Sequence, residues 1–173
     1  MNDNDATSNF GKYFSWIAWL LAILLLFFVF QDYLDNAWNP NQQPTIRLSK
    51  TGQAEVILKQ NRQGHYVAKG NINDSPVTFL LDTGATQVSI PARVAQRLNL
   101  SGKGESYVQT ANGDTRVYQT TLTQLSIGDI FLYNVPANIN PAMQGDEVLL
   151  GMSALKHIQF QQTGKQLILR EQP

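Results

Sequence analysis

A short apolar strand pattern that stops at a carboxylate is the feature of this sequence that most limits its fold. Residues Val77 to Leu81 form an unbroken run with β-branched and aromatic members, typical of a strand buried on both faces. The run leads directly into Asp82, Thr83 and Gly84. A carboxylate there is costly unless it is solvated or hydrogen-bonded, and Gly84 permits a tight turn. The stretch therefore predicts a core strand that holds Asp82 rigidly at a surface.

The tripeptide Asp82-Thr83-Gly84 alone is also compatible with a strand that ends in an ordinary Asx-type turn. The residues on either side make the pattern more specific. Three hydrophobic residues precede the aspartate, and Ala-Thr-Gln-Val-Ser-Ile-Pro follows at residues 85–91. The whole stretch resembles the active-site segment of the retropepsin-like aspartic proteases, and most closely that of their bacterial, membrane-anchored "clan AA" members. The resemblance extends from about Gly52 to the C-terminus.

The resemblance implies an all-β fold, a retropepsin-like closed β-barrel with one lobe of the acid protease fold per chain and one or two short helices. It implies that Asp82 is the catalytic residue and that Thr83, Gly84, Ala85 and Thr86 complete the active-site turn. Thr83 of each copy would bond across a two-fold axis, and Gly84 and Ala85 would line the substrate groove with backbone groups. The implied substrate is a peptide or protein that binds as an added strand.

A second turn pattern lies further along the chain. Two short strand patterns flank Ala-Asn-Gly-Asp at residues 111–114, and Asn-Gly favours the positive φ values of a tight hairpin turn. The resemblance implies that this hairpin is the flap, which closes over the substrate, with Ala111, Asn112 and Gly113 at its tip. Turn chemistry alone fits a plain surface hairpin equally well.

Residues 148–155 repeat the pattern of an apolar strand that stops at a glycine. The resemblance implies that Leu150 and Gly151 form the loop beside the active site and that a short helix begins there. A serine nucleophile elbow, G-x-S-x-G, is the other motif to consider. It fails because Leu155 occupies the position of its last glycine.

Two positions depart from the retroviral members of the family. Those proteins carry an aspartate shortly after the catalytic turn that pairs with an arginine after the later glycine. Here the corresponding positions hold Thr86 and Met152. Because both halves of the ion pair are missing together, we interpret the change as a consistent replacement of a buried pair. The flap is also less rich in glycine than a retroviral one.

Peptide hydrolysis by carboxylates needs two of them, one ionised to take a proton from water and one protonated to polarise the scissile carbonyl. The sequence contains no second Asp-Thr-Gly or Asp-Ser-Gly. The simplest source of the second carboxylate is Asp82 of another copy across a two-fold axis, which predicts a homodimer through the protease domain. Asp146 or Glu147 could instead supply a partner within the same chain.

The N-terminal part of the chain has the composition of a membrane anchor. Residues 1–12 are polar, and residues 13–31 carry no charge and are almost wholly apolar over a length that can span a membrane as a helix. Trp16, Trp19 and Tyr33 suit an interfacial aromatic belt. A cleaved signal peptide is the alternative, although the apolar run is long for one and no Ala-x-Ala-like site follows it.

The orientation of such an anchor depends on few charges. Lys12 is the basic side chain on the N-terminal side, and the next one on the other side is Arg47. The positive-inside rule then predicts a cytoplasmic N-terminus in the inner membrane and, in a bacterium, a periplasmic main domain. Residues 32–51, rich in Asn, Gln and Pro, are expected to form a linker, and residues 52–173 the protease domain.

Composition excludes several other classes of protein. The 173 residues contain 13 basic and 13 acidic side chains and no cysteine. The balanced charge gives no reason to expect nucleic acid as a partner, and a chain without cysteine has neither disulfides nor thiol catalysis. The only histidines are His65 and His157, without a zinc motif around them. No metal and no cofactor are expected.

Alternating patterns separated by turn signals predict an all-β domain. The strands expected lie at residues 55–59, 65–72, 77–81, 88–90, 107–110, 115–118, 122–127, 130–135, 148–150, 158–162 and 165–169. Pro91 is expected to open a short helix over residues 92–98, and residues 136–147 are expected to form a polar loop.

The sequence therefore favours a membrane-anchored, homodimeric aspartic endopeptidase with an acidic to near-neutral pH optimum. A retropepsin-fold module that binds peptides or assembles at the membrane without cleaving them is the alternative. An unrelated anchored β domain with a coincidental turn at Asp82 is the third possibility.

Overall fold

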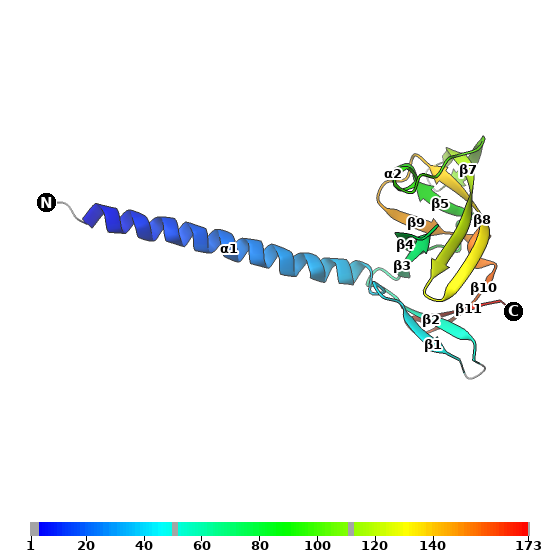
Figure 1. Ribbon diagram of the computed structural model, residues 1–173, viewed down its shortest axis with the longest axis horizontal. Helices are drawn as coiled ribbons and strands as arrows, with labels where there is room; N and C mark the ends of the chain where they lie inside the picture. Colours follow the sequence, from blue (N-terminus) through cyan, green and yellow to red (C-terminus); the bar gives the residue numbers. More distant parts are fainter. Residues whose placement is uncertain (1–3, 50–51, 111–112, 173) are drawn as a thin grey trace. The chain divides into compact units, whose positions relative to one another are not determined.

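The computed structural model describes residues 4–49, 52–110 and 113–172. The chain divides into two compact units, Met1–Ala37 and Trp38–Pro173. Figure 1 shows both units and labels most of their elements.

The first unit is helix α1, which runs from Asn4 to Trp38, its last residue belonging to the second unit. The part from Gly11 to Trp38 is 28 residues long and apolar enough to cross a membrane, although a signal sequence near an N-terminus has the same properties. Helix α1 continues seven residues beyond Gln31, the predicted end of the apolar span. Leu34 and Ala37 are good helix formers, which is consistent with this extension.

The second unit is built almost entirely of strands, as predicted. Its strands are β1 (Thr45–Leu48), β2 (Ala54–Lys59), β3 (Val67–Ile72), β4 (Ser75–Leu81), β5 (Val88–Pro91), β6 (Glu105–Thr110), β7 (Gly113–Ile127), β8 (Ile130–Asn140), β9 (Glu147–Leu150), β10 (Ile158–Thr163) and β11 (Gln166–Glu171). Two short helices, α2 (Ala92–Arg97) and α3 (Met152–Leu155), follow β5 and β9. The predicted all-β fold class is confirmed.

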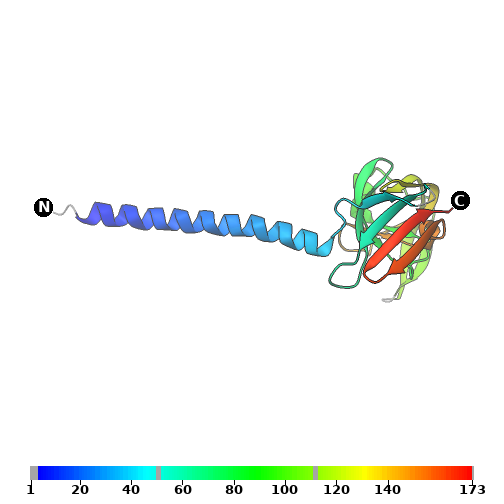
Figure 2. The same ribbon diagram turned by 90° about the horizontal axis from the view of Figure 1, so that it is seen from below.

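The strands form two sheets. The smaller has the order β1-β2-β11-β10, and Figure 2 shows its N-terminal strands in cyan beside its C-terminal strands in red. The larger has the order β3-β4-β9-β5-β8-β7-β6, and β3 also pairs with β7, so that its strand order closes on itself. Strand β9 lies between β4 and β5, which are consecutive in the chain. The turn from β4 to β5 must therefore pass over the end of β9.

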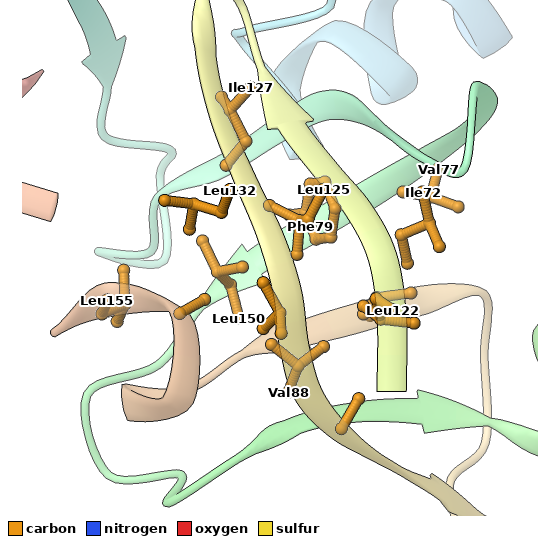
Figure 3. Close-up of a cluster of buried hydrophobic side chains, with 14 of the residues drawn as sticks. Ile72, Val77, Phe79, Val88, Leu122, Leu125, Ile127, Leu132, Leu150 and Leu155 are labelled. Atoms are coloured by element: carbon orange, nitrogen blue, oxygen red, sulfur yellow. The ribbon is translucent and has the colours of Figure 1, made fainter. Parts of the chain in front are cut away.

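One cluster of buried apolar side chains joins the two sheets. Figure 3 shows part of it, in which Phe79 of β4 lies among side chains from β7, β8 and β9. Val56, Leu58 and Leu169 of the smaller sheet belong to the same cluster and are fully buried. The cluster fixes β4 and β9, the two strands whose ends carry the candidate site.

Part of the segment expected to be a linker is ordered structure of the second unit. Strand β1 pairs with β2, and Asn41 is almost fully buried beside β3. The Asn41 side chain accepts a hydrogen bond from the Lys59 N–H at 2.7 Å and donates to the carbonyl oxygens of Lys59 and Val67. An asparagine that bridges two strands leaves no hydrophobic periodicity, so the sequence pattern does not reveal this contact.

The prediction of a loop over residues 136–147 was wrong for residues 136–140, because β8 continues to Asn140. Pro136 pairs with Thr121 across the β7–β8 hairpin, and Ala137 and Ile139 are buried. Asn138 and Asn140 are buried as well, since their side chains find hydrogen-bond partners. Buried amides interrupt the apolar alternation that a strand prediction depends on.

Candidate active site

Asp82 lies at the end of β4 in a turn that holds its carboxylate. The backbone N–H of Gly84 donates to Oδ1 of Asp82 at 2.8 Å, and the Ala85 N–H donates to the Asp82 carbonyl oxygen at 3.3 Å. A Cβ on Gly84 would lie 3.1 Å from Oδ1, so a larger residue would press on the carboxylate. The side chain is half-buried, and Oδ2 has no partner within residues 4–49, 52–110 and 113–172. One oxygen is thus fixed and the other is available.

The turn is fastened to β9 and α3 by three backbone hydrogen bonds. The Asp82 N–H donates to the Leu150 carbonyl oxygen at 3.2 Å, on the strand inserted between β4 and β5. The Met152 N–H donates to the Ala85 carbonyl oxygen at 2.8 Å, and the Ser153 N–H donates to that of Thr86 at 3.0 Å. Leu150, predicted to lie beside the active-site turn, therefore contacts it directly.

Gly151 lies directly under the turn. A Cβ at this position would overlap the Gln87 carbonyl group and lie 2.7 Å from the Ala85 carbonyl oxygen. Its φ of −90° is open to every residue type, so the glycine is required by the close approach and not by a left-handed backbone.

The side chain of Ser153 joins three segments at the same place. Its Oγ donates to the Pro136 carbonyl oxygen of β8 at 2.7 Å and accepts from the Val88 N–H of β5 at 2.9 Å. The serine is buried and fully used in these bonds. It acts as a structural link between β5, β8 and α3, which agrees with the failure of the nucleophile-elbow motif.

The backbone bonds also account for the missing ion pair at Thr86 and Met152. Thr86 is exposed and Met152 is half-buried against the core cluster. Their segments are connected by the backbone bonds from Met152 to Ala85 and from Ser153 to Thr86, and by the uncharged Ser153 hydroxyl, which accepts from the Val88 N–H. The turn is held to the helix without a charged side chain.

The register of the larger sheet puts five residues in one row beneath the turn. Leu80 pairs with Val67 on one side and with Leu149 on the other, Leu149 pairs with Ser89, and Ser89 pairs with Asn138. Paired residues point to the same face of a sheet, and residues two apart along a strand share that face. Asp82 is two residues beyond Leu80, so this row lies on the face that carries the carboxylate. We call it the groove row.

The groove row is apolar at one end and polar at the other. Val67 is fully buried outside the core cluster, while Leu80 and Leu149 are half-buried. Ser89 and Asn138 are buried and hydrogen-bonded to each other, with 2.7 Å from the Ser89 Oγ to the Asn138 Oδ1.

A pocket of about 350 Å³ lies on the other side of Asp82, toward the smaller sheet. Two residues of the active-site turn, five largely apolar side chains and one glutamine line it: Asp82, Thr83, Tyr66, Leu81, Leu155, Phe160, Leu167 and Gln162. The Tyr66 hydroxyl is buried without a hydrogen-bond partner in the described part of the chain, and burial raises the pKa of this phenol. Phe160 comes from β10, an edge strand of the smaller sheet, and is 46% exposed.

The predicted hairpin over residues 107–118 is formed by β6 and β7. Thr110 pairs with Gly113, whose φ of 101° is the left-handed conformation expected for the turn glycine. Ala111 and Asn112, the other residues predicted at the flap tip, lie outside the described residues. An Arg116–Glu105 ion pair of 3.6 Å ties the base of the hairpin across its two strands.

Asp146 and Glu147, the residues considered as a carboxylate partner for Asp82 within the same chain, both bond to other side chains. Asp146 forms an ion pair of 2.8 Å with Arg93, and Glu147 accepts a hydrogen bond of 3.1 Å from the Trp38 indole N–H. Within the described ranges, no three His, Asp or Glu side chains form a group that could hold a metal ion.

A comparison with family models decides the affiliation of the chain. The model described as "gag-polyprotein putative aspartyl protease" matches residues 68–157, more than half of the sequence, including the Asp82 turn and Gly151. The chain belongs to this aspartyl protease family. The predicted resemblance to retropepsin-like aspartic proteases is confirmed.

A crystal structure of a retropepsin-like aspartic protease from Rickettsia conorii is similar, with 28% identity and a TM-score of 0.58 over 66% of this chain and 97% of that one. An uncharacterised protein from the cobV 5′ region of a Sinorhizobium species is 29% identical over 88% of this chain and 71% of its own length. An uncharacterised protein of Rickettsia prowazekii (strain Madrid E) is 27% identical to this chain. The match covers 66% of this chain and 50% of that protein.

Sequence patterns did not single out several residues of the site. Ser153 was considered only as a failed nucleophile, and Tyr66, Ser89 and Asn138 carry no local signal. The groove row becomes visible only once the register across five strands is known. A serine or asparagine within an apolar stretch is the one sequence signal that could have identified such residues. A polar side chain that is buried there needs a hydrogen-bond partner from another segment.

Proposed function

We propose that this protein is a membrane-anchored aspartic endopeptidase that works as a homodimer. One observation carries the proposal: the Asp82 carboxylate is held by the Gly84 N–H at the end of a core strand. Its Oδ2 has no partner among the described residues, and the groove row lies beside it. The turn is rigid because it is bonded to Leu150, Met152 and Ser153. Such a group is suited to acid–base chemistry on a peptide laid across it.

The proposed reaction uses the Asp82 side chains of two copies, which share one proton because two like charges so close cannot both ionise. The ionised carboxylate takes a proton from water as the water oxygen attacks the scissile carbonyl carbon. The protonated carboxyl gives its proton to the carbonyl oxygen. Transfer of a proton to the amide nitrogen then lets the C–N bond break, and the carboxylates return to their shared-proton state. Thr83 of each copy would fix the pair by bonding across the axis.

The pocket beside Asp82 is the surface where the second copy would dock. It is continuous with Asp82 and Thr83, and its apolar members include the half-exposed Phe160 of an edge strand. The buried Tyr66 hydroxyl has no hydrogen-bond partner among the residues that the structure describes, and a second chain would supply one. An edge strand offers unpaired backbone groups for pairing with that chain.

The substrate would be an extended peptide between the groove row and the β6–β7 hairpin. Gly84 and Ala85 would contribute backbone groups to the groove. Ala111, Asn112 and Gly113 would form the tip of the flap. No metal or cofactor takes part in this proposal.

Helix α1 supports the location that we propose for the enzyme. It has the length and composition of a single membrane span, with Lys12 as the basic residue near its N-terminal end. The positive-inside rule places the N-terminus in the cytoplasm and the protease unit on the periplasmic side of the inner membrane.

The test uses the full chain in detergent micelles with an unbiased peptide library. Wild type is compared with Asp82→Asn and with Asp129→Asn, a matched change on the exposed turn before β8. Wild type and Asp129→Asn are expected to cleave as dimers, while Asp82→Asn is expected to dimerise without cleaving. The rate should be highest at acidic to near-neutral pH.

Cleavage that survives Asp82→Asn, or a rate that still rises well above neutral pH, would contradict the shared-aspartate mechanism. A wild-type dimer that retains peptides without cutting them would favour a binding module instead.

A further inference from the structure

The apolar end of the groove row is covered by the segment that precedes β1. Val67, at this end of the row, is fully buried although it lies outside the core cluster. Its carbonyl oxygen accepts a hydrogen bond of 2.7 Å from the Asn41 Nδ2. Asn39 and Asn41 are each 3% exposed, so the segment is packed against the protease unit. Because Val67 points to the groove face, its cover must lie on that face.

The side chain of Trp38, at the start of this segment, reaches across the groove face. Its Nε1 donates to the Glu147 Oε1 at 3.1 Å, and its ring lies edge-on to His65 with the centroids 6.5 Å apart. Glu147 is two residues before Leu149 and His65 is two residues before Val67, so alternation puts both on the face of the groove row. Since β4 lies between β3 and β9, the indole spans β4 at the apolar end of the row.

The same register brings Trp38 close to the level of the catalytic candidate. The Leu81 N–H donates to the Tyr66 carbonyl oxygen at 3.0 Å, so the pairing of β3 with β4 continues one step beyond the end of β3. The next step brings His65 to the level of Asp82. The indole that packs against His65 therefore borders the part of the groove that is nearest to the carboxylate.

Trp38 is held at its backbone as well as at its ring. Its carbonyl oxygen accepts from the Asn61 Nδ2 at 3.0 Å, and Asn61 is itself 8% exposed. The Asn61 Oδ1 accepts from the N–H groups of Gln63 and His65. A ring fixed at both ends resists displacement, so an incoming peptide meets a rigid wall at this end of the groove.

We infer that Trp38 is a specificity-determining residue that fills the apolar end of the groove and admits only glycine, alanine or serine at the substrate position facing it. The inference rests on the proposed peptidase function and specifies its substrate class. Leu80 and Leu149 are half-buried at this place and, without the indole, would form an apolar pocket suited to leucine or phenylalanine. A large side chain has to displace the bonded ring, which weakens binding in the ground state and the transition state alike. Trp38 precedes residues 68–157, the part that matches the family model, so the selectivity comes from a segment outside that part.

The test compares the full chain in detergent micelles with Trp38→Ala, Trp38→Phe and a matched control, Tyr133→Ala. Tyr133 is an aromatic residue of β8 that is 64% exposed. Cleavage is measured with a peptide library that varies one position at a time. At one position, wild type and Tyr133→Ala should prefer alanine over phenylalanine by at least about tenfold in kcat/KM. Trp38→Ala should lower that ratio to about one, while Trp38→Phe, which keeps a ring, should retain most of it. A general loss of stability would lower all rates and leave the ratio unchanged.

A second measurement depends neither on cleavage nor on the folding of Trp38→Ala. The chain contains three tryptophans, and the other two, Trp16 and Trp19, lie in α1. In an Asp82→Asn chain that also carries Trp16→Phe and Trp19→Phe, the fluorescence comes from Trp38 alone. A peptide with alanine at the selected position should change this emission on binding, and the phenylalanine peptide should bind at least about tenfold more weakly.

The outcomes separate the inference from the peptidase function. Size-selective binding that changes the Trp38 emission supports the inference even if wild type does not cleave, and then the peptidase function alone is overturned. A wild-type preference for large side chains, a profile that Trp38→Ala leaves unchanged, or binding without a change in emission overturns the inference and leaves the peptidase function intact. An equal gain for every side chain in Trp38→Ala also overturns it, because the indole would then obstruct the groove without selecting. If wild type neither cleaves nor binds any peptide, both are overturned.

Discussion

Gly151 lies so close to the backbone of Gln87 that a Cβ at position 151 would overlap the Gln87 carbonyl group. The two residues are far apart in the sequence and meet because β9 is inserted between β4 and β5. The position of Asp82 is consequently set by a segment nearly seventy residues further along the chain. A change in the packing of β9 at Gly151 would therefore displace the turn that carries Asp82.

Replacement of Gly151 by alanine should damage both stability and activity. The added methyl group meets backbone atoms on one side, which cannot rotate away, so the turn has to shift. We expect Gly151→Ala to lower the free energy of unfolding by about 1–3 kcal/mol and to abolish cleavage. Thermal unfolding and peptide cleavage measure the two effects. Gly11→Ala is the control, since its Cβ would meet no atom within 4 Å. Equal stability of the two variants would show that the turn above Gly151 accommodates a methyl group without strain.

Ser153→Ala removes the side chain that links β5, β8 and α3. The Val88 N–H and the Pro136 carbonyl oxygen then lose their Ser153 partner inside the unit. We expect a loss of about 1–3 kcal/mol in the free energy of unfolding, measured by urea titration. Ser101→Ala, on an exposed loop, is the control and should change stability by less than about 0.5 kcal/mol. If Ser153→Ala has the same free energy of unfolding as wild type, a water molecule must replace the hydroxyl as the hydrogen-bond partner.

Local patterns predicted most of the strands and the turn that follows β4 at Asp82. Turn residues such as Asn73-Asp74 and Gly128 marked hairpins, because the positive φ values at these three positions favour Gly, Asn and Asp. The strand that ends at Asp82 was visible because its apolar run is continuous. These features depend on residues close together in the sequence.

Features that depend on distant segments were not predictable. The insertion of β9 between β4 and β5 and the groove row arise from pairings across many residues. The continuation of β8 to Asn140 and the burial of Asn41 depend on amide side chains that find distant partners. A single sequence shows an asparagine but not the carbonyl group that it will bond, so these segments look like loops.

The segment Trp38–Leu48 should be required for a stable protease unit. Asn41 bonds both Lys59 and Val67, and β1 covers one edge of β2. A fragment of residues 38–173 is expected to fold with a higher Tm than a fragment of residues 52–173. Loss of the three Asn41 bonds and of the β1–β2 pairing, at about 0.5–1.5 kcal/mol per hydrogen bond, predicts a gap of roughly 10 °C or more.

Asn41→Ala in the longer fragment separates the side-chain bonds from the strand. It should lower the Tm by several degrees on its own, because the Lys59 N–H loses its partner. Asn36→Ala in the full chain, an exposed position on helix α1, is the matched control. Equal Tm values for the two fragments would mean that the segment only covers the surface.

Glu55 should make stability depend on acid pH. Its carboxylate is 4% exposed and bonds Arg47 and Arg170 at 2.8 Å each. The hydrogen bond from Arg47, reinforced by that from Arg170, lowers the pKa of Glu55 below its ordinary value of 4.5. A lowered pKa in the folded state adds stability that is complete above the unfolded pKa and is lost as pH falls through the folded one.

The free energy of unfolding of wild type should therefore exceed that of Glu55→Gln at neutral pH, and the difference should shrink as pH falls below about 4.5. Urea titrations across the pH range measure it. Glu105→Gln is the control, because its ion pair with Arg116 is long at 3.6 Å and more than half exposed. A difference between wild type and Glu55→Gln that stays constant down to the lowest pH would contradict the role of the ionised carboxylate.

If the proposed homodimer forms through the pocket beside Asp82, Phe160→Asp should separate its two copies without unfolding either. The side chain is 46% exposed on the edge strand β10 and lines the pocket beside Asp82. A charge there disfavours burial against a second copy but is tolerated in water. We expect the dimer dissociation constant, from concentration-dependent mass measurements, to rise at least about tenfold, with cleavage falling in parallel. Phe131→Asp is the matched control, since Phe131 is 42% exposed on β8 and does not line that pocket. A Phe160→Asp protein that remains dimeric and active would place the docking surface elsewhere on the protease unit.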